Sequence, residues 1–211
     1  EYAFKRNGIP YRIIGGTRFF DHTEVKDMLA YLHIINNPND DLRLKRIINK
    51  PARKLGAKAL ETIERLARAE GKPMYHVLSN PDDYAPLEKN VKAIRAFTDL
   101  IEGLTNLLEE GISLGEFYEE VMERTGYVEM LKSKPSEENQ TRIENVRELK
   151  SSIVSYAQDT EEPTLSGFLE EIALYTDIEQ YDAGADAAVM MTIHSAKGLE
   201  FDHVFLVGFE D

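Results

Sequence analysis

A polar cluster near the end of the chain places a histidine, a lysine, a glycine and a glutamate within residues 194–200. It lies between two apolar runs, residues 189–193 and 204–207, whose length and β-branched content are typical of strands. In open α/β sheets ligands bind at strand ends, where the connecting loops form a crevice. The pattern therefore predicts a ligand-binding loop, although a polar turn between strands can also be only a solvated loop.

A second candidate site is a basic stretch in the first third of the chain. Residues 42–58 contain seven basic side chains and no acid: Arg43, Lys45, Arg46, Lys50, Arg53, Lys54 and Lys58. Pro51 and Gly56 bracket a tight connection, and a helix is expected to begin near Ala57. The free N–H groups and the dipole at a helix start favour an anion. The stretch therefore predicts a phosphate contact that ignores base sequence, the alternative being a plain helical turn.

Composition limits the classes of protein that fit. The 211 residues carry a formal net charge of −13 and no cysteine, which excludes a disulfide framework, thiolate metal ligands and a cysteine nucleophile. The acidic balance argues against wholesale wrapping by a polyanion and favours one local docking site. No apolar run approaches the roughly 20 residues of a membrane span, and no signal peptide is evident. We expect a cytoplasmic protein without membrane contact, and both ends look cut from a larger protein.

Strand signals occur only towards the two ends of the chain, with helical patterns between them. A short strand with a glycine turn is expected at residues 11–16, and Asp21 with Glu24 resembles a capping box. Helical spacing then predicts helices over residues 25–35, 42–48, 59–67, 86–108, 113–125, 137–156 and 165–175. The simplest arrangement pairs the end segments in one small α/β unit, with the helical block as an insertion.

Several segments together resemble one protein family. The run T-I-H-S-A-K-G-L-E-F from Thr192 resembles motif V of the PcrA/UvrD-type superfamily 1 DNA helicases, with ten consecutive residues in family order. Residues 9–27 resemble a family segment that reads F-F-x-R-x-E, although His22 stands at the arginine position. Residues 46–57 resemble the stretch that ends in Gly-Ile-Gly, with Lys54 in place of the first glycine. The resemblance covers nearly the whole chain.

The resemblance implies a fold and a division of the chain. The expected fold is mainly α, an all-helical insertion flanked by pieces of a small RecA-like α/β unit. Residues 1–38 and 186–211 would belong to the RecA-like subdomain 2A, the second piece carrying motif V, and residues 39–185 to the helical subdomain 2B.

The family's activity is ATP-dependent 3′→5′ DNA unwinding in repair and replication. This segment would contribute duplex contact, conformational control and coupling of ATP to single-stranded DNA. By resemblance, Gly198 permits close approach of the nucleotide and Glu200 hydrogen-bonds its ribose, while Thr192 and His194 lie against single-stranded DNA. The implied duplex-binding residues are Arg53, Lys54, Leu55, Gly56, Ala57 and Lys58, and Arg18 is a further candidate for a phosphate contact.

Motifs that the chain lacks limit what it does alone. It has no G-x-x-x-x-G-K-S/T phosphate loop, no D-E pair at a strand end and no later arginine motif, so it supplies at most one wall of a phosphoryl-transfer site. ATP and Mg²⁺ are expected in the full-length parent, whereas the chain alone is predicted to bind neither, to hold no metal and to be inactive.

Two other functions stay open. One is a UvrD-like subunit of a recombination helicase–nuclease. The other is a regulatory protein-interaction module, whose acidic helices bind a repair protein or RNA polymerase.

Overall fold

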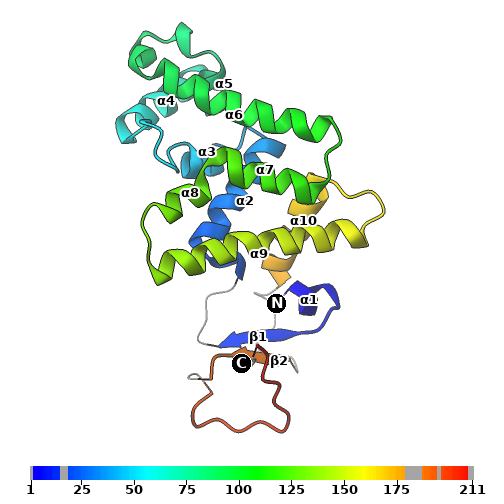
Figure 1. Cartoon of the computed structure of the whole chain (residues 1–211). Helices are drawn as coiled ribbons and strands as arrows, with labels where there is room; N and C mark the ends of the chain where they lie inside the picture. The colour runs from blue at the N-terminus through cyan, green and yellow to red at the C-terminus, as the bar shows by residue number, and fades with distance from the viewer. Residues whose placement is uncertain (1, 15–18, 179–186, 194–195, 209–211) are drawn as a thin grey trace.

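Two short strands from opposite ends of the chain form a parallel pair beneath a block of helices (Figure 1). The computed structural model describes residues 2–14, 19–178, 187–193 and 196–208. Strand β1 (Tyr11–Ile14) pairs with β2 (Ala188–Met191), with Tyr11 opposite Ala188. Parallel strands need a crossover connection, and here the whole helical block supplies it. The predicted pairing of the end segments is confirmed.

The helical block makes the fold mainly α, as predicted. It contains α2 (Thr23–Asn36), α3 (Asp41–Ile47), α4 (Ala57–Glu70), α5 (Met74–Ser79), α6 (Val91–Glu109), α7 (Leu114–Thr125), α8 (Tyr127–Lys132), α9 (Glu137–Asp159) and α10 (Leu165–Ile178). Short 3-10 turns cover Phe19–Asp21, Pro81–Asp83 and Ala85–Asn90, the last leading into α6. A further short helix, α1 (Tyr2–Arg6), precedes β1, and the Arg6 guanidinium ties it to α9 through Ser155 Oγ (3.1 Å) and the Asp159 carboxylate.

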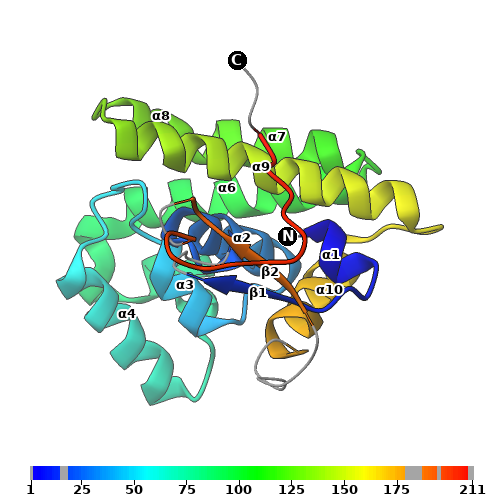
Figure 2. The same cartoon turned by 90° about the horizontal axis from the view of Figure 1, so that it is seen from below.

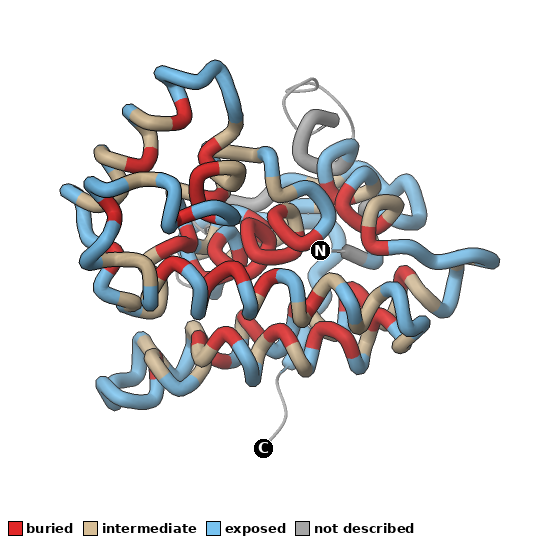
Figure 3. Tube along the Cα trace, turned by 90° about the horizontal axis from the view of Figure 1, so that it is seen from above, coloured by how far each residue is buried: buried red, intermediate tan, exposed pale blue. Residues whose placement is uncertain are grey.

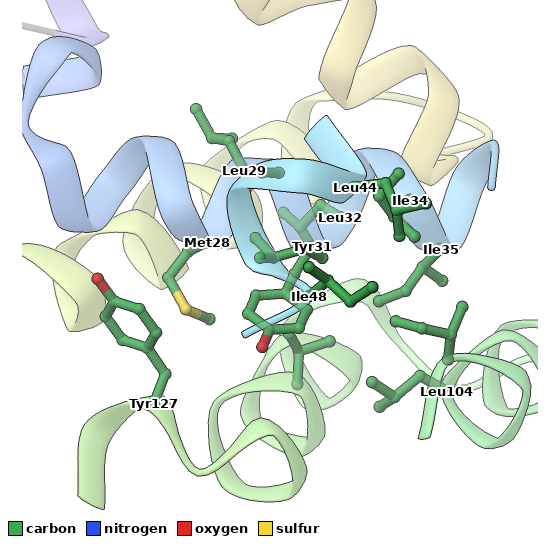
Figure 4. Packing of buried hydrophobic residues seen from close by; sticks show 14 of the residues in the cluster. Met28, Leu29, Tyr31, Leu32, Ile34, Ile35, Leu44, Ile48, Leu104 and Tyr127 are labelled. Carbon is green, nitrogen blue, oxygen red and sulfur yellow. The ribbon is translucent and has the colours of Figure 1, made fainter. Parts of the chain in front are cut away.

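Helix α2 forms the centre of the block and is buried on nearly all sides (Figure 3). It packs against α3, α6, α9 and α10, and Met28, Tyr31 and Leu32 have no exposed surface (Figure 4). Each such side chain contributes about 1.5–3 kcal/mol of transfer free energy. Apart from its buried carboxylates Glu24 and Asp27, the buried surface of α2 is largely apolar, and such a helix is stable only when enclosed. By packing, α2 lies with the helical block, while the division at residues 38 and 185 stays a prediction.

Helix ends follow the sequence signals in most places. The Ser113 hydroxyl caps α7 by accepting from the Glu116 N–H (3.3 Å), and Gly71 (φ 64°) ends α4 in the left-handed conformation. The capping box expected at Asp21 is wrong, because α2 begins one residue later than that motif requires. Its N-cap is His22, whose side chain makes no capping hydrogen bond.

The strand predicted at residues 204–207 is also wrong. The structure has no strand there, and Phe205 and Val207 are 88% and 90% exposed. A strand needs a neighbour to pair its backbone groups, and in the described residues β1 pairs only with β2. Figure 2, which views the molecule from below, shows this last segment running past β2 without joining the sheet. None of the described helices has the length and apolar character of a membrane span.

Candidate functional site

The connection between α3 and α4, residues 49–58, is called the basic turn here. The Asn49 side chain organises it, because its Oδ1 accepts from the N–H groups of Arg53 (2.7 Å) and Leu55 (3.2 Å). Leu55 is 1% exposed and anchors the turn in the core. Lys54 adopts φ 63°, the left-handed conformation that favours glycine. The backbone therefore keeps a glycine-type bend although a lysine occupies that position.

The guanidinium of Arg53 points into the protein. It donates to the hydroxyl of Tyr31 (2.6 Å) and to the carbonyls of Ile47 (3.1 Å) and Thr125 (3.2 Å). It also lies over the rings of Tyr31 and Phe97, at 5.7 and 5.5 Å from their centroids. Five donors in a fixed fork suit such a set of acceptors. Arg53 and Leu55 thus hold the turn in place, and their side chains are not presented to a ligand.

Most cations of the basic stretch are paired within the protein. Arg43 pairs with Asp40, Lys45 with Glu64 (2.9 Å), and Arg46 and Lys50 both pair with Asp27 (2.7 and 2.8 Å). Lys54 and Lys58 are exposed and form no ion pair with any residue that the structure describes. The charge available to an anion is therefore much smaller than the sequence suggests.

The two free lysines flank the start of α4. Gly56 is its N-cap and supplies no side-chain cap, and the first intrahelical bond runs from the Leu60 N–H to the Gly56 carbonyl (3.1 Å). The amides of Ala57, Lys58 and Ala59 precede that bond and lie at the positive end of the dipole. No atom stands within 4 Å of a Cβ built on Gly56, so a ligand can approach the backbone there.

The second candidate site is the loop that follows β2, called the strand-end loop (residues 192–200). In its described residues the Ala196 N–H donates to the Thr192 carbonyl and the Leu199 N–H to the Ala196 carbonyl, both at 3.0 Å. Gly198 has φ 85°, a conformation that favours glycine. The side chains of Thr192, Lys197 and Glu200 are exposed. His194 and Arg18 lie outside the described residues.

The structure leaves the two candidate sites apart. The basic turn lies in the helical block and the strand-end loop beneath the sheet (Figure 1). Sequence reasoning missed Asn49, Asp27 and Tyr127, which support the turn from within. The signal for Asp27 was a carboxylate among the apolar residues of α2, which is rare unless the charge is paired.

An acidic hollow of about 660 Å³ lies on the face formed by α7, α8 and α9. It is lined by five glutamates and one arginine, together with three apolar residues: Glu116, Glu119, Glu120, Glu123, Glu129, Arg147, Ile112, Met122 and Val128. Two of these carboxylates already form ion pairs, Glu119 with Lys150 and Glu120 with Arg124. Within the described residues no group of His, Asp and Glu is placed to hold a metal ion.

Comparison with known proteins assigns the family. The chain belongs to the family of UvrD-like helicase C-terminal domains, whose model matches residues 1–211. It is 41% identical over 217 residues to the ATP-dependent DNA helicase PcrA of Bacillus subtilis (strain 168). Identity to the ATP-dependent DNA helicases PcrA of Staphylococcus epidermidis and Staphylococcus aureus is 37% over 213 residues. Each comparison covers 100% of this chain and 29% of the relative, so the chain spans about three-tenths of their length.

Proposed function

We propose that the chain is a segment of an ATP-dependent 3′→5′ DNA helicase, in which the basic turn contacts duplex DNA. The observation that carries the proposal is the uncapped start of α4, open at Gly56 and flanked by Lys54 and Lys58. Phosphate is the ligand class that such a helix start prefers. A backbone-directed contact of this kind is independent of sequence, as translocation along DNA requires. Lys54, Gly56, Ala57 and Lys58 make the contact, and Arg53 and Leu55 position it.

The proposed contact is tested by the salt dependence of duplex binding. Each phosphate neutralised contributes about 0.9 to the slope of log K against log salt. Replacing Lys54 and Lys58 together by alanine should therefore flatten the slope by up to about two. The matched control replaces Lys134 and Arg147, two exposed cations on the α8–α9 side, and should leave the slope unchanged. Equal slopes for the parent chain and the Lys54/Lys58 variant would contradict the proposal.

We further propose that the strand-end loop couples nucleotide to single-stranded DNA in the full-length protein. Glu200 would accept a hydrogen bond from the ribose hydroxyl, and Gly198 would allow the nucleotide to approach the backbone closely. Thr192 and His194 would contact the backbone of single-stranded DNA, and Arg18 would contact a phosphate. ATP and Mg²⁺ would bind only when the rest of the site is present. Family membership and the exposed, glycine-bent loop support this assignment.

The nucleotide role predicts a measurable loss. In the full-length protein Glu200→Ala should weaken nucleotide binding or turnover by roughly 1.5–3 kcal/mol, the worth of a hydrogen bond to a charged acceptor. Lys197→Ala, three residues earlier in the same loop, is the matched control. The 211-residue chain alone should show no DNA-stimulated ATP turnover, and a rate of about 1 per second from it would refute the assignment.

A protein-binding role is the second candidate, and the acidic hollow is the observation that favours it. A partner such as a repair protein or RNA polymerase would then bind at α7 and α8. Charge reversal at Glu116 and Glu123 should abolish capture of that partner and leave duplex binding intact. The opposite pattern would assign the function to DNA alone.

A further inference from the structure

We propose that Asp27 is a positioning residue that confines the phosphate-binding charge of the basic turn to Lys54 and Lys58. It does so by holding Arg46 and Lys50 against the core. The inference rests on the proposed duplex contact, and it accounts for two of the cations in residues 42–58 that are held within the protein, Arg46 and Lys50.

The Asp27 carboxylate is at the centre of a buried polar network. Its side chain is 0% exposed, and it points from α2 towards the chain that links α3 to α4. Oδ1 accepts from Arg46 Nε at 2.7 Å, and Oδ2 lies 2.8 Å from Lys50 Nζ. The hydroxyl of Tyr127 on α8 donates to the same Oδ2 at 2.6 Å, and Figure 4 shows its ring reaching towards α2. All three partners converge on one carboxylate.

A buried carboxylate of this kind binds its cations firmly. A charge without water is costly unless it is paired and hydrogen-bonded, so Asp27 cannot release its partners without a penalty. Arg46 and Lys50 differ from Asp27 in this respect, because their side chains are 35% and 41% exposed. Without the carboxylate, either side chain could swing into solvent and meet a phosphate. Asp27 thus withholds Lys50, and it withholds Arg46 together with the Thr23 carbonyl, which accepts from Arg46 Nη2 at 3.1 Å.

The other paired cations of the stretch do not share this restraint. Lys45 and Glu64 are 34% and 35% exposed, and Arg43 and Asp40 are 42% and 23% exposed. Exposed ion pairs are weak and screened by salt, so an approaching phosphate can compete for those cations. Asp27 differs from Glu64 and Asp40 in being fully buried, so its pairs are the ones that phosphate is least able to displace.

The same network also fixes the geometry of the turn. The Tyr31 hydroxyl donates to the Lys50 carbonyl (2.6 Å) and accepts from Arg53, so the residue held by Asp27 is also held through its backbone. The base of the turn is therefore fixed at Lys50 and Arg53, and its free end carries Lys54, Gly56 and Lys58. A phosphate therefore meets Lys54, Gly56 and Lys58 in one arrangement, with Arg46 and Lys50 held away from it.

The test is the salt slope of duplex binding by the 211-residue chain and its variants, each first shown to be folded by circular dichroism. Asp27→Asn keeps the side-chain shape and removes the charge, so Arg46 and Lys50 join the phosphate-binding set. The slope should then steepen by up to about 1.8, at about 0.9 per added contact. Tyr127→Phe is the matched control, since it removes a hydrogen bond from the network and leaves both ion pairs. Its slope should equal that of the parent.

A slope for Asp27→Asn equal to that of the parent would overturn the inference, as would an equal rise in Tyr127→Phe. Should Asp27→Asn fail to fold, Lys50→Gln in the parent serves instead. The inference expects its slope to be unchanged, and a fall of about 0.9 would overturn it.

A measurement without DNA separates this inference from the proposed function. Acylation of surface amines by an activated acetate ester, followed by mass spectrometry, compares Lys50 with Lys58. The ratio of acylation at Lys50 to acylation at Lys58 should be several-fold higher in Asp27→Asn than in the parent chain. The same ratio in both proteins would overturn the inference. Failure of the duplex contact itself would appear elsewhere, as an unchanged slope when Lys54 and Lys58 are removed.

Discussion

Replacing Arg53 by lysine should destabilise the fold far more than any change at the free lysines. Lysine keeps the charge, but it cannot reproduce a fork that reaches the Tyr31 hydroxyl at 2.6 Å and the Thr125 carbonyl at 3.2 Å. Hydrogen bonds to charged groups contribute about 1.5–3 kcal/mol each, and the contacts with the Tyr31 and Phe97 rings add roughly 0.5–1 kcal/mol. Because Arg53 is only half-buried and lysine recovers one bond, we expect a net loss of about 2–3 kcal/mol.

Urea unfolding followed by circular dichroism measures this loss directly. Lys58→Ala is the control, and an exposed residue of this kind should change the free energy of unfolding by less than about 0.5 kcal/mol. In thermal scans the Arg53 variant should melt roughly 5–10 °C below the parent. A stability within about 0.5 kcal/mol of the parent, combined with weaker duplex binding, would refute the reasoning. That result would make Arg53 a ligand-binding residue instead of a structural one.

Three further perturbations have defined outcomes. Lys54→Gly should raise the free energy of unfolding by about 0.5–1 kcal/mol, as measured by urea titration. The substitution relieves the left-handed strain at φ 63°, and this gain exceeds the loss from the greater chain entropy of glycine in the unfolded state. Burial lowers the pKa of His33 from 6.5 to about 4, so the unfolded chain binds its proton more readily between those values. Stability should fall by about 1–2 kcal/mol as the pH drops from 6.5 towards 4, and His33→Gln should remove that part of the pH dependence of unfolding. Gly167→Ala should cost about 1–3 kcal/mol, because its Cβ would clash with the Tyr156 hydroxyl, and Tyr156→Phe should recover part of that loss in a double-mutant cycle.

Helix positions were predictable where a pattern repeats over several turns. The spacing of apolar residues located α4 and α6, a capping box at Ser113 located the start of α7, and Gly71 and Gly126 marked two helix ends. The six-residue helices α5 and α8 were missed, because so short a segment shows less than two full periods. The strand predicted at residues 204–207 was wrong for a different reason. An apolar run indicates burial or strand pairing, but it does not show which part of the protein would be the partner.

The basic turn was located from sequence, but its electrostatics were not. A run of seven cations is visible in the chain, whereas their anionic partners come from elsewhere: Asp27 from α2 and Glu64 from α4. Such pairs depend on packing between helices and have no sequence spacing of their own. The left-handed bend at Lys54 was not predicted either, because a lysine itself gives no sign of it, although the resemblance placed Lys54 at a glycine position.

The parallel pairing of β1 with β2 has a consequence for the order of folding. The two strands are brought together only by closing a loop that contains the whole helical block, and closing so long a loop costs chain entropy before any ladder bond forms. The helices gain most of their contacts locally, so they form first and bring the strand segments close. The sheet should then assemble last and open first, and the amides of β2 should exchange with solvent faster than those of α2. The strand-end loop depends on β2 for its position and so inherits this low local stability.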